Sequence, residues 1–237
     1  MKKYKKNFDY SYALGTELTL ELLLQFPQEV INVYIHSKQN KNEVFNRIKS
    51  LCLKHNIEMI YSDKIFNIVS NKENCYIIGV FKKYESKINP KSNHVVLVNP
   101  SNMGNLGTII RTSIGFGIND IAIISPAVDI FDPKTIRASM GALFRLNFQY
   151  FDSFEEYLKT VEKRDIFPFM LDGSKQLDKI EVTNKYSLVF GNEATGLSSN
   201  YRNYGQSILI KHLDTIDSLN LCNAVSIALY QFTKGRL

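Results

Sequence analysis

The stretch NPSNMGNLGTIIRTS, residues 99–113, follows an apolar run and sets two glycines among asparagines. This order predicts a strand, a tight bend and a helix. Glycines let backbone N–H groups approach a ligand closely, and the N-terminus of a helix carries partial positive charge. Arg111, four residues after Gly107, adds a forked cation that suits a phosphate. The stretch is either a plain connection with a solvated arginine or a site that handles an anion.

Two common nucleotide-binding classes do not fit this bend. Asn102 occupies the first of the three glycine positions of a dinucleotide fingerprint, which leaves only Gly104 and Gly107. Ser125 ends the next apolar run, where a ribose-binding carboxylate is needed. The chain also contains no G-x-x-x-x-G-K-[ST] phosphate loop. The sequence therefore argues against a dehydrogenase or a nucleoside triphosphatase.

The charge of the 237 residues is unevenly distributed. Residues 1–92 hold fifteen Lys and Arg against nine Asp and Glu, whereas residues 93–237 hold fourteen of each. Such segregation suggests two modules, of which the first meets a polyanion. A basic surface that only keeps the protein in solution explains the charge equally well.

The order of apolar runs predicts an α/β protein with two domains. In the first part we expect helices at 17–26, 40–56 and 63–70 and strands at 30–37, 57–62 and 75–81, which form a small α/β sandwich. A polar segment with Pro90 then separates two strand-like runs. In the second part we expect strands at 94–100, 120–125, 144–151, 166–171, 187–191 and 208–213, and helices after the bend and at 133–142, 153–164 and 217–232. The predicted boundaries are a first domain at 1–85, a linker at 86–93 and a second domain at 94–237.

Cysteines and histidines give no sign of a metal site. The three cysteines lie far apart in apolar stretches, which predicts buried, reduced thiols in a cytoplasmic protein: Cys52, Cys75 and Cys222. The four histidines form no cluster either: His36, His55, His94 and His212. The charged first residues are not followed by the apolar core of a signal peptide. No run of about 18 apolar residues occurs, so we expect no membrane span.

Two further stretches combine glycine, a carboxylate and amides. LVFGNEATGLS, residues 188–198, places Glu193 between Gly191 and Gly196 after a predicted strand. DSLNLCNAVSIAL, residues 217–229, opens the last predicted helix. Each has an ordinary structural explanation: Glu193 as a helix cap or a surface charge, Ser218 as the N-cap and Asn220 as a first-turn residue.

Taken together, in this order and spacing, NMGNLGTIIRT, VFGNEATGLS and SLNLCNAVSIALY resemble the three motifs of the SpoU (TrmH-type) family of RNA ribose 2′-O-methyltransferases, within the SPOUT superfamily. RASMGALFRL, residues 137–146, resembles the segment that the family carries between them. The first domain, with YALGTELTLELL and NCYIIGVFKKY, is similar to the ribosomal-protein-like RNA-binding domain that precedes many of these enzymes.

The resemblance implies a second domain with a deep trefoil knot, in which the C-terminal segment passes through a loop. It implies S-adenosyl-L-methionine as the cofactor and a homodimer whose site is completed across the interface. The cofactor-binding positions it implies are Gly191, Asn192, Glu193, Gly196, Ile210 and Leu219. The catalytic positions it implies are Asn105, Arg111, Glu193, Ser218 and Asn220. Two stretches depart from the family pattern, Ala194 and the Ile-Lys-His of residues 210–212.

The implied reaction transfers a methyl group to a ribose 2′-OH, and no metal is required for it. Because a guanidinium resists deprotonation, we expect Arg111 to bind the neighbouring phosphate and to stabilise the developing alkoxide rather than to act as a base. Glu193 could hold Arg111, hold a loop of the partner subunit, or accept the proton through water. Ribosomal RNA is the expected substrate. The alternatives are transfer RNA, an rRNA methylation that confers antibiotic resistance, and a non-catalytic RNA-binding or ribosome-assembly factor.

Overall fold

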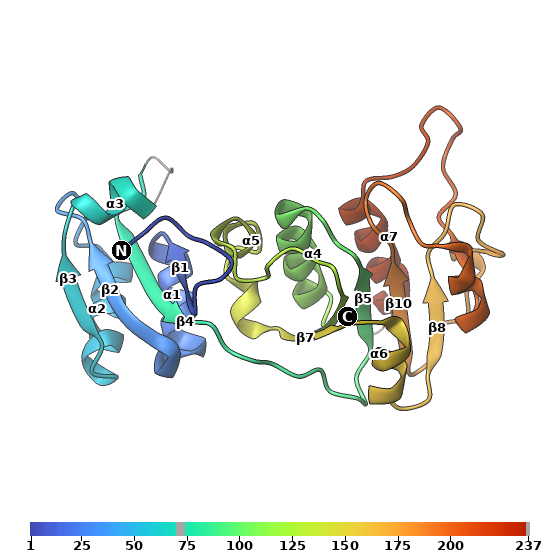
Figure 1. Cartoon of the computed structure of the whole chain (residues 1–237), viewed down its shortest axis with the longest axis horizontal. Helices are drawn as coiled ribbons and strands as arrows, with labels where there is room; N and C mark the ends of the chain where they lie inside the picture. Colours follow the sequence, from blue (N-terminus) through green and yellow to red (C-terminus); the bar gives the residue numbers. More distant parts are fainter. Residues whose placement is uncertain (70–73, 236–237) are drawn as a thin grey trace. The chain divides into compact units, whose positions relative to one another are not determined.

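The computed structural model describes residues 1–69 and 74–235 (Figure 1). The chain forms two compact units, one of Met1–Glu85 with Asp129–Arg145 and one of Ser86–Val128 with Leu146–Leu237. Residue 70 of the predicted helix 63–70 and residues 236–237 of the predicted second domain lie outside the described residues. No helix of the described segments has both the length and the apolar character that a membrane span requires.

Unit 1 contains a four-stranded sheet. Its strands, in spatial order, are β1 (Tyr10–Leu14), β4 (Ile77–Lys82), β2 (Val30–Ile35) and β3 (Glu58–Tyr61). β4 pairs antiparallel with β1 and β2, and β3 pairs parallel with β2. The strand β1, with the sequence YSYAL, was not expected from the sequence.

The helices of unit 1 cover both faces of this sheet. They are α1 (Thr16–Gln25), α2 (Glu43–Lys54) and α3 (Lys64–Val69), with a 3-10 turn at Pro27–Glu29. Ile77 packs with residues of α1 and α2, whereas its neighbour Ile78 packs with residues of α3. Successive side chains of a strand point to opposite faces, so the sheet is buried on both sides. The α/β class predicted for this region is therefore observed.

The segment 129–145 belongs to unit 1, although the predicted second domain at 94–237 contains it. It contains α5 (Pro133–Ala138) and the 3-10 turn Ala142–Arg145. Ser11 Oγ in β1 donates to the carbonyl of Phe131 at 2.5 Å, and Arg145 Nη2 lies 2.8 Å from Glu21 Oε2 in α1. The second unit is therefore built from two pieces of chain.

Residues 86–93 also differ from the predicted free linker, because they pack into unit 2. Ile88 is buried in the core of that unit. The backbone N–H of Asn89 donates to Asp120 Oδ1 at 2.7 Å, and the hydroxyl of Ser86 accepts from the N–H of Phe148 at 3.0 Å. An isolated apolar residue in a polar stretch was the one sequence signal that this segment is anchored.

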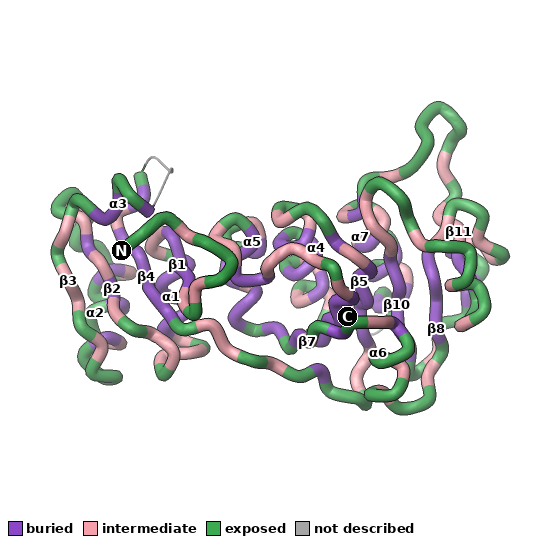
Figure 2. Tube along the Cα trace, viewed as in Figure 1, coloured by how far each residue is buried: buried purple, intermediate pink, exposed green. Residues whose placement is uncertain are grey.

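Unit 2 is built on a five-stranded parallel sheet. In spatial order its strands are β7 (Asn147–Phe151), β6 (Asp120–Ile124), β5 (His94–Val98), β10 (Tyr186–Phe190) and β8 (Asp165–Pro168). A small second sheet pairs β9 (Lys175–Gln176) with β11 (Ile208–Leu209). The predicted strands 166–171 and 208–213 are thus shorter than expected. Purple tubes at β5 and β10 in Figure 2 mark the buried centre of the large sheet.

Helices lie on both faces of the large sheet. One face packs against α6 (Phe154–Thr160) and the 3-10 turn Ser199–Tyr204. α4 (Met103–Gly115) packs against α7 (Leu221–Thr233), α7 packs against β10, and a 3-10 turn at Leu177–Lys179 lies beside α7. The last helix has one buried and one exposed side: Val225 and Leu229 are buried, while Ile227 is 42% and Tyr230 59% exposed.

The order of strands fixes where a ligand site can form. From β5 the chain continues to β6 on one side, whereas β10 lies on its other side. In an open parallel sheet, ligands bind beyond the carboxyl ends of the strands where the strand order reverses. The loops after β5 and β10 meet at this point.

A buried polar cluster lies at the opposite, amino-terminal end of β5. The ring of His94, the first residue of β5, is fully buried. Its Nε2 lies 2.8 Å from the carbonyl of Asn89, and its Nδ1 lies 2.8 Å from the hydroxyl of Tyr157 and 3.0 Å from Nη1 of Arg164. Because the guanidinium can only donate, Nδ1 is the acceptor and Nε2 carries the proton.

Candidate functional site

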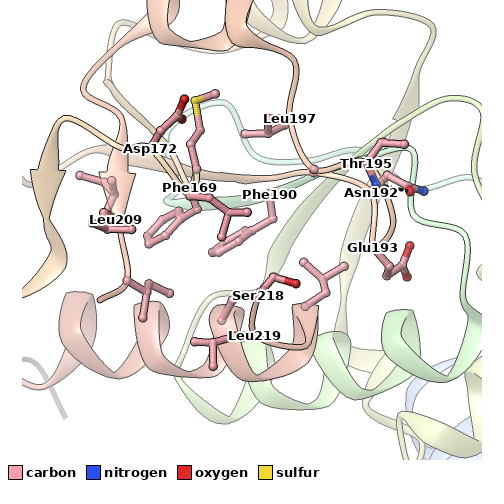
Figure 3. A pocket seen from close by; sticks show the side chains of 18 of the residues that line it. Phe169, Asp172, Phe190, Asn192, Glu193, Thr195, Leu197, Leu209, Ser218 and Leu219 are labelled. Carbon is pink, nitrogen blue, oxygen red and sulfur yellow. Dashed lines mark hydrogen bonds between the residues drawn. The ribbon is translucent and has the colours of Figure 1, made fainter. Parts of the chain in front are cut away.

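A cavity of about 380 Å³ lies beside the loop that follows β10 (Figure 3). Phe169 and Phe190 form its apolar wall, with their ring centroids 4.4 Å apart and nearly parallel. In Figure 3, Ser218 and Leu219 approach these rings from the segment that precedes α7. Most of the tube between β11 and α7 is green in Figure 2, so this segment is largely exposed.

All six positions expected to bind a cofactor line this cavity: Gly191, Asn192, Glu193, Gly196, Ile210 and Leu219. Of the remaining positions expected to be catalytic, Ser218 lines it as well. Ala194 and His212, which depart from the family pattern, also face the cavity. The structure thus brings three separated stretches of chain to one hollow, while the roles assigned to these residues remain predictions.

The bend after β10 requires two glycines. A Cβ at Gly191 would lie 2.1 Å from the carbonyl carbon of Gly196, so the two backbones approach more closely than any side chain allows. Gly196 has a φ of +66°, which favours glycine. Asn192 fixes the bend, because its Oδ1 accepts from the N–H of Ala194 at 2.9 Å and its Nδ2 donates to the carbonyl of Asn99 at 2.7 Å.

Glu193 joins this bend to the start of α4. Its Oε2 accepts from the hydroxyl of Ser101 at 2.7 Å and from the N–H of Ser101 at 3.0 Å. Its Oε1 accepts from the N–H of Asn102 at 3.2 Å and from Nδ2 of Asn105 at 3.1 Å. Partial burial disfavours the charged form, but the hydrogen bonds from Ser101 and Asn105 outweigh it and hold the pKa of Glu193 below its usual value. The carboxylate is therefore ionised and fully engaged at neutral pH.

Asn105 also connects α4 to α7. The thiol of Cys222 donates to Oδ1 of Asn105 at 3.4 Å and to its carbonyl at 3.5 Å. Burial raises the pKa of Cys222, so the thiol keeps the proton that this contact needs. Cys222 is only half-buried, whereas the sequence analysis expected a buried thiol. Its lone position in the sequence gave no signal of this role.

Asn220, rather than Ser218, is the N-cap of α7. Its side chain accepts from the N–H of Cys222 at 2.8 Å, and the helix begins at Leu221. Both residue types cap helices well, and here the chain at Ser218 and Leu219 is used instead to line the cavity. The start of α4 is built in the same way, since Asn102 Oδ1 accepts from the N–H groups of Gly104 and Asn105.

Arg111 lies apart from this hydrogen-bond network. It is exposed on α4, and within the described part of the chain its guanidinium makes no hydrogen bond or ion pair. Glu193 holds Ser101, Asn102 and Asn105 instead of Arg111, so the first of the three roles considered for this carboxylate is not observed. A cation without a neutralising partner is available to an anionic ligand.

Sequence reasoning missed the residues that support the site. Ser101 stood in the opening stretch, but nothing in its spacing indicated a hydrogen bond to a residue 92 positions later. Phe169 looked like an ordinary strand residue. Among residues 1–69 and 74–235, no three His, Cys, Asp or Glu side chains are grouped so that they could hold a metal ion.

The fold and the cavity define an α/β protein with a ligand site at the strand-order reversal of a parallel sheet. The chain belongs to the SpoU rRNA Methylase family, whose model matches residues 92–230. The match covers β5 to α7 and includes all three motifs.

Individual relatives agree with this family. A 23S rRNA (uridine(2479)-2′-O)-methyltransferase from Streptomyces viridochromogenes is 31% identical over 151 residues, which are 60% of this chain and 53% of that protein. The chain thus spans about half the length of this relative.

Solved structures are similar as well. An AdoMet-bound rRNA methyltransferase from Sinorhizobium meliloti superposes with a TM-score of 0.84 at 23% identity, over 97% of this chain and 88% of that one. A structure concerned with 2-OH methylation of C/U34 on tRNA superposes with a TM-score of 0.56 at 26% identity, over 62% of this chain and all of that one. The first likeness establishes the shared fold of nearly the whole chain.

Proposed function

We propose that this protein transfers a methyl group from S-adenosyl-L-methionine to the 2′-OH of a ribose in RNA. The observation that carries the proposal is the carboxylate of Glu193. It lies in the cavity wall and is hydrogen-bonded to the start of α4. Glu193 therefore connects the cavity, where the methyl donor would bind, to the helix that carries Arg111. Membership of the SpoU rRNA Methylase family supports the same reaction.

The cavity suits the proposed cofactor. Its volume of about 380 Å³ lies in the range of small-molecule pockets, and apolar rings line it beside exposed polar groups. Phe169, Phe190 and Leu219 offer apolar surface to a nucleoside, and the close approach at Gly191 leaves backbone groups as the polar partners. The AdoMet-bound neighbour supports this assignment. When bound, the cofactor supplies an already activated methyl group.

The residues of the chain then have to orient the ribose and help it lose a proton. Arg111 carries a guanidinium, which keeps its positive charge, so it binds the phosphate beside the target and stabilises the developing alkoxide. Ser218 and Asn220 hold the ribose: the Ser218 hydroxyl lies at the cavity, and the amide N–H₂ of Asn220 is not used in capping α7. Such positioning is a large part of catalysis in a transfer between two bound partners.

Glu193 acts in this proposal as the organiser of the site. It already accepts four hydrogen bonds and its pKa is lowered, so it is a poor acceptor for the ribose proton. The proton of the 2′-OH therefore passes to solvent water. Asn105, held between Glu193 and Cys222, keeps the start of α4 in place.

The Arg111→Ala variant tests the proposal. Because the side chain is exposed and makes no contact that α4 needs, the variant is expected to fold and to bind S-adenosyl-L-methionine as the wild type does, by calorimetry. Methyl transfer to RNA from a radiolabelled donor is expected to fall more than a hundredfold. Activity within tenfold of the wild type, a barrier change below about 1.4 kcal/mol, would refute the proposed role of Arg111.

Ribosomal RNA is the proposed substrate, because the family and the 23S rRNA-modifying relative point to it. Transfer RNA is the second candidate, supported by the structure concerned with C/U34 on tRNA. Mapping 2′-O-methyl groups in both RNAs, with and without the gene, separates the two and identifies the nucleotide. Resistance to a ribosome-targeting antibiotic is scored in the same strains. A protein that binds RNA but not the methyl donor would instead be the non-catalytic factor.

We further propose a homodimer. Leu213 and Ile216 in the loop before α7 are 77% and 50% exposed, and Ile227 and Tyr230 on α7 also reach solvent. Exposed apolar side chains of this kind favour contact with another protein surface. Analytical ultracentrifugation is expected to give twice the mass of the chain, 27.2 kDa. A monomer at working concentration would contradict this.

The trefoil knot, the RNA-binding role of unit 1 and the cytoplasmic location are parts of the same proposal. Close backbone crossings support the knot: a Cβ at Gly173 would lie 2.3 Å from the carbonyl carbon of Ile208, and one at Gly205 would lie 2.1 Å from the carbonyl oxygen of Ile166. An experimental chain trace in which the segment after β11 does not pass through a loop would refute the knot.

The helix-covered sheet and the basic charge of unit 1 support its RNA-binding role. Fractionation of cells tests the cytoplasmic location.

A further inference from the structure

The positive charge of the protein is concentrated in a short segment of unit 1. The two pieces of unit 1 hold sixteen Lys and Arg against eleven Asp and Glu, an excess of five out of the six of the whole chain. Residues 2–9, KKYKKNFD, hold four lysines against one aspartate. More than half of the excess of unit 1 therefore lies in eight residues, which we call the basic strap.

The basic strap precedes the first strand but is fixed to unit 1 through its backbone. Tyr12 in β1 donates its hydroxyl to the carbonyl of Lys2 at 2.6 Å. Lys83, just after β4, donates through Nζ to the carbonyl of Lys6 at 2.8 Å and lies 5.0 Å from the ring centroid of Tyr4. The same Nζ is 2.9 Å from Asp129 Oδ2, so the cation that holds the strap is itself held by a half-buried ion pair.

Aromatic rings provide a second anchor. Tyr4 donates its hydroxyl to Asp129. The ring of Phe8 meets that of Tyr4 edge-on and stacks on Tyr10, which in turn meets Tyr12 in the core of unit 1. The rings of the strap thus face the sheet.

This arrangement leaves the charges outward. Lys2, Lys3 and Lys5 are exposed, and no acidic side chain of the described residues forms an ion pair with them. Three cations are therefore presented on a backbone whose conformation is already fixed. Binding of a polyanion to these lysines costs less conformational entropy than binding to a flexible basic tail.

We propose that the basic strap is a preorganised contact surface for the phosphate backbone of the RNA substrate. The inference rests on the proposed function for the identity of the partner. A membrane surface is the less suitable partner, because interfacial binding needs apolar groups that insert, and Tyr4 and Phe8 are half-buried against unit 1. Phosphate contacts of this kind fix the position of RNA without reading its sequence.

The test compares two triple variants of the full chain with equal loss of charge. Lys2, Lys3 and Lys5 are changed to Gln in the first variant. Lys41, Lys49 and Lys54, exposed residues in or just before α2, are changed to Gln in the control. Affinity for a ribosomal RNA transcript is measured by fluorescence anisotropy from low to moderate salt. The strap variant is expected to bind about tenfold more weakly or worse, with a salt slope lower by about 2, since each lost phosphate contact removes ~0.7–0.9.

A third variant tests the preorganisation. Tyr12→Phe keeps every cation but removes the hydroxyl that holds the carbonyl of Lys2. It is expected to weaken binding severalfold with an unchanged salt slope.

The inference is overturned if the strap variant and the α2 control lose the same affinity, or if the strap variant binds RNA as the wild type does. Loss of binding to vesicles that contain phosphatidylserine, with RNA binding intact, would also overturn it. Methyl transfer is measured in parallel, and the strap variant is expected to need a higher RNA concentration for half-maximal transfer. A wild-type protein that binds the transcript through the strap but methylates no RNA would refute the proposed reaction and leave the strap standing.

Discussion

The buried ring of His94 predicts a specific dependence of stability on pH. Burial, followed by the nearby charge of Arg164, lowers the pKa of His94 to about 4, and the hydrogen bond to the carbonyl of Asn89 only partly opposes this. In an unfolded chain the pKa of histidine is ≈ 6.5. Between these two values the unfolded protein binds one proton more than the folded protein does.

The sign follows from this difference. Stability rises with pH wherever the unfolded state binds more protons, so the contribution of His94 is complete above about pH 6.5 and is lost as the pH falls toward 4. The full difference between the folded and unfolded pKa values of His94 corresponds to about 3 kcal/mol, of which roughly 2 kcal/mol is already lost at about pH 5. Most carboxylates titrate below that pH, so the interval is well separated from ordinary acid unfolding.

The assay is urea unfolding of the full chain, followed by circular dichroism at about pH 7.5 and about pH 5. The wild type is expected to lose about 2 kcal/mol more between the two conditions than His94→Gln, which cannot take up the proton. A direct measurement covers the case in which this variant folds poorly. The ring proton signals of His94 in the NMR spectrum of the wild type should not titrate above about pH 5. A midpoint near 6.5 would refute the reasoning.

Three further predictions concern the backbone crossings and the site. Gly205→Ala should lower the unfolding free energy by more than about 2 kcal/mol, because the new Cβ would meet the backbone of β8. Gly115→Ala, where a Cβ meets nothing, should be neutral or stabilising, and thermal unfolding compares the two variants. Asn220→Ala should cost about 1 kcal/mol through the lost cap, and Asn220→Ser should restore stability but not methyl transfer; equal recovery of both would mean a purely structural role. Ser101→Ala should cost about 1 kcal/mol and lower methyl transfer severalfold, because the half-buried Glu193 loses its shortest hydrogen bond; unchanged kinetics would contradict this.

The α/β class was predicted from the local pattern of apolar runs, whereas the convergence of the three motifs was implied by the family resemblance. Apolar runs separated by glycine bends indicate parallel strands, and the carboxyl ends of such strands meet at one edge. Asn105 and Glu193 are 88 residues apart, yet they are hydrogen-bonded in the structure. The cavity positions were expected from the family resemblance alone.

The features that the sequence did not predict depend on which surface a segment packs against. Nothing in the pattern of α5 indicates that it leaves unit 2 for unit 1, since that choice rests on contacts such as Arg145 with Glu21. The anchoring of residues 86–93 depends on Ile88 alone. Asn220 rather than Ser218 caps α7, a difference of two positions that propensity cannot resolve because both residue types cap well.

The bridge through Glu193 has a thermodynamic consequence. Its carboxylate ties the loop at the cavity to the first turn of α4, so a ligand that displaces the loop must break four hydrogen bonds or carry the helix start with it. Binding of a ligand in the cavity and binding of a ligand at the surface of α4 are then coupled. Such coupling is reciprocal: whatever factor the first ligand applies to the affinity of the second, the second applies to the first.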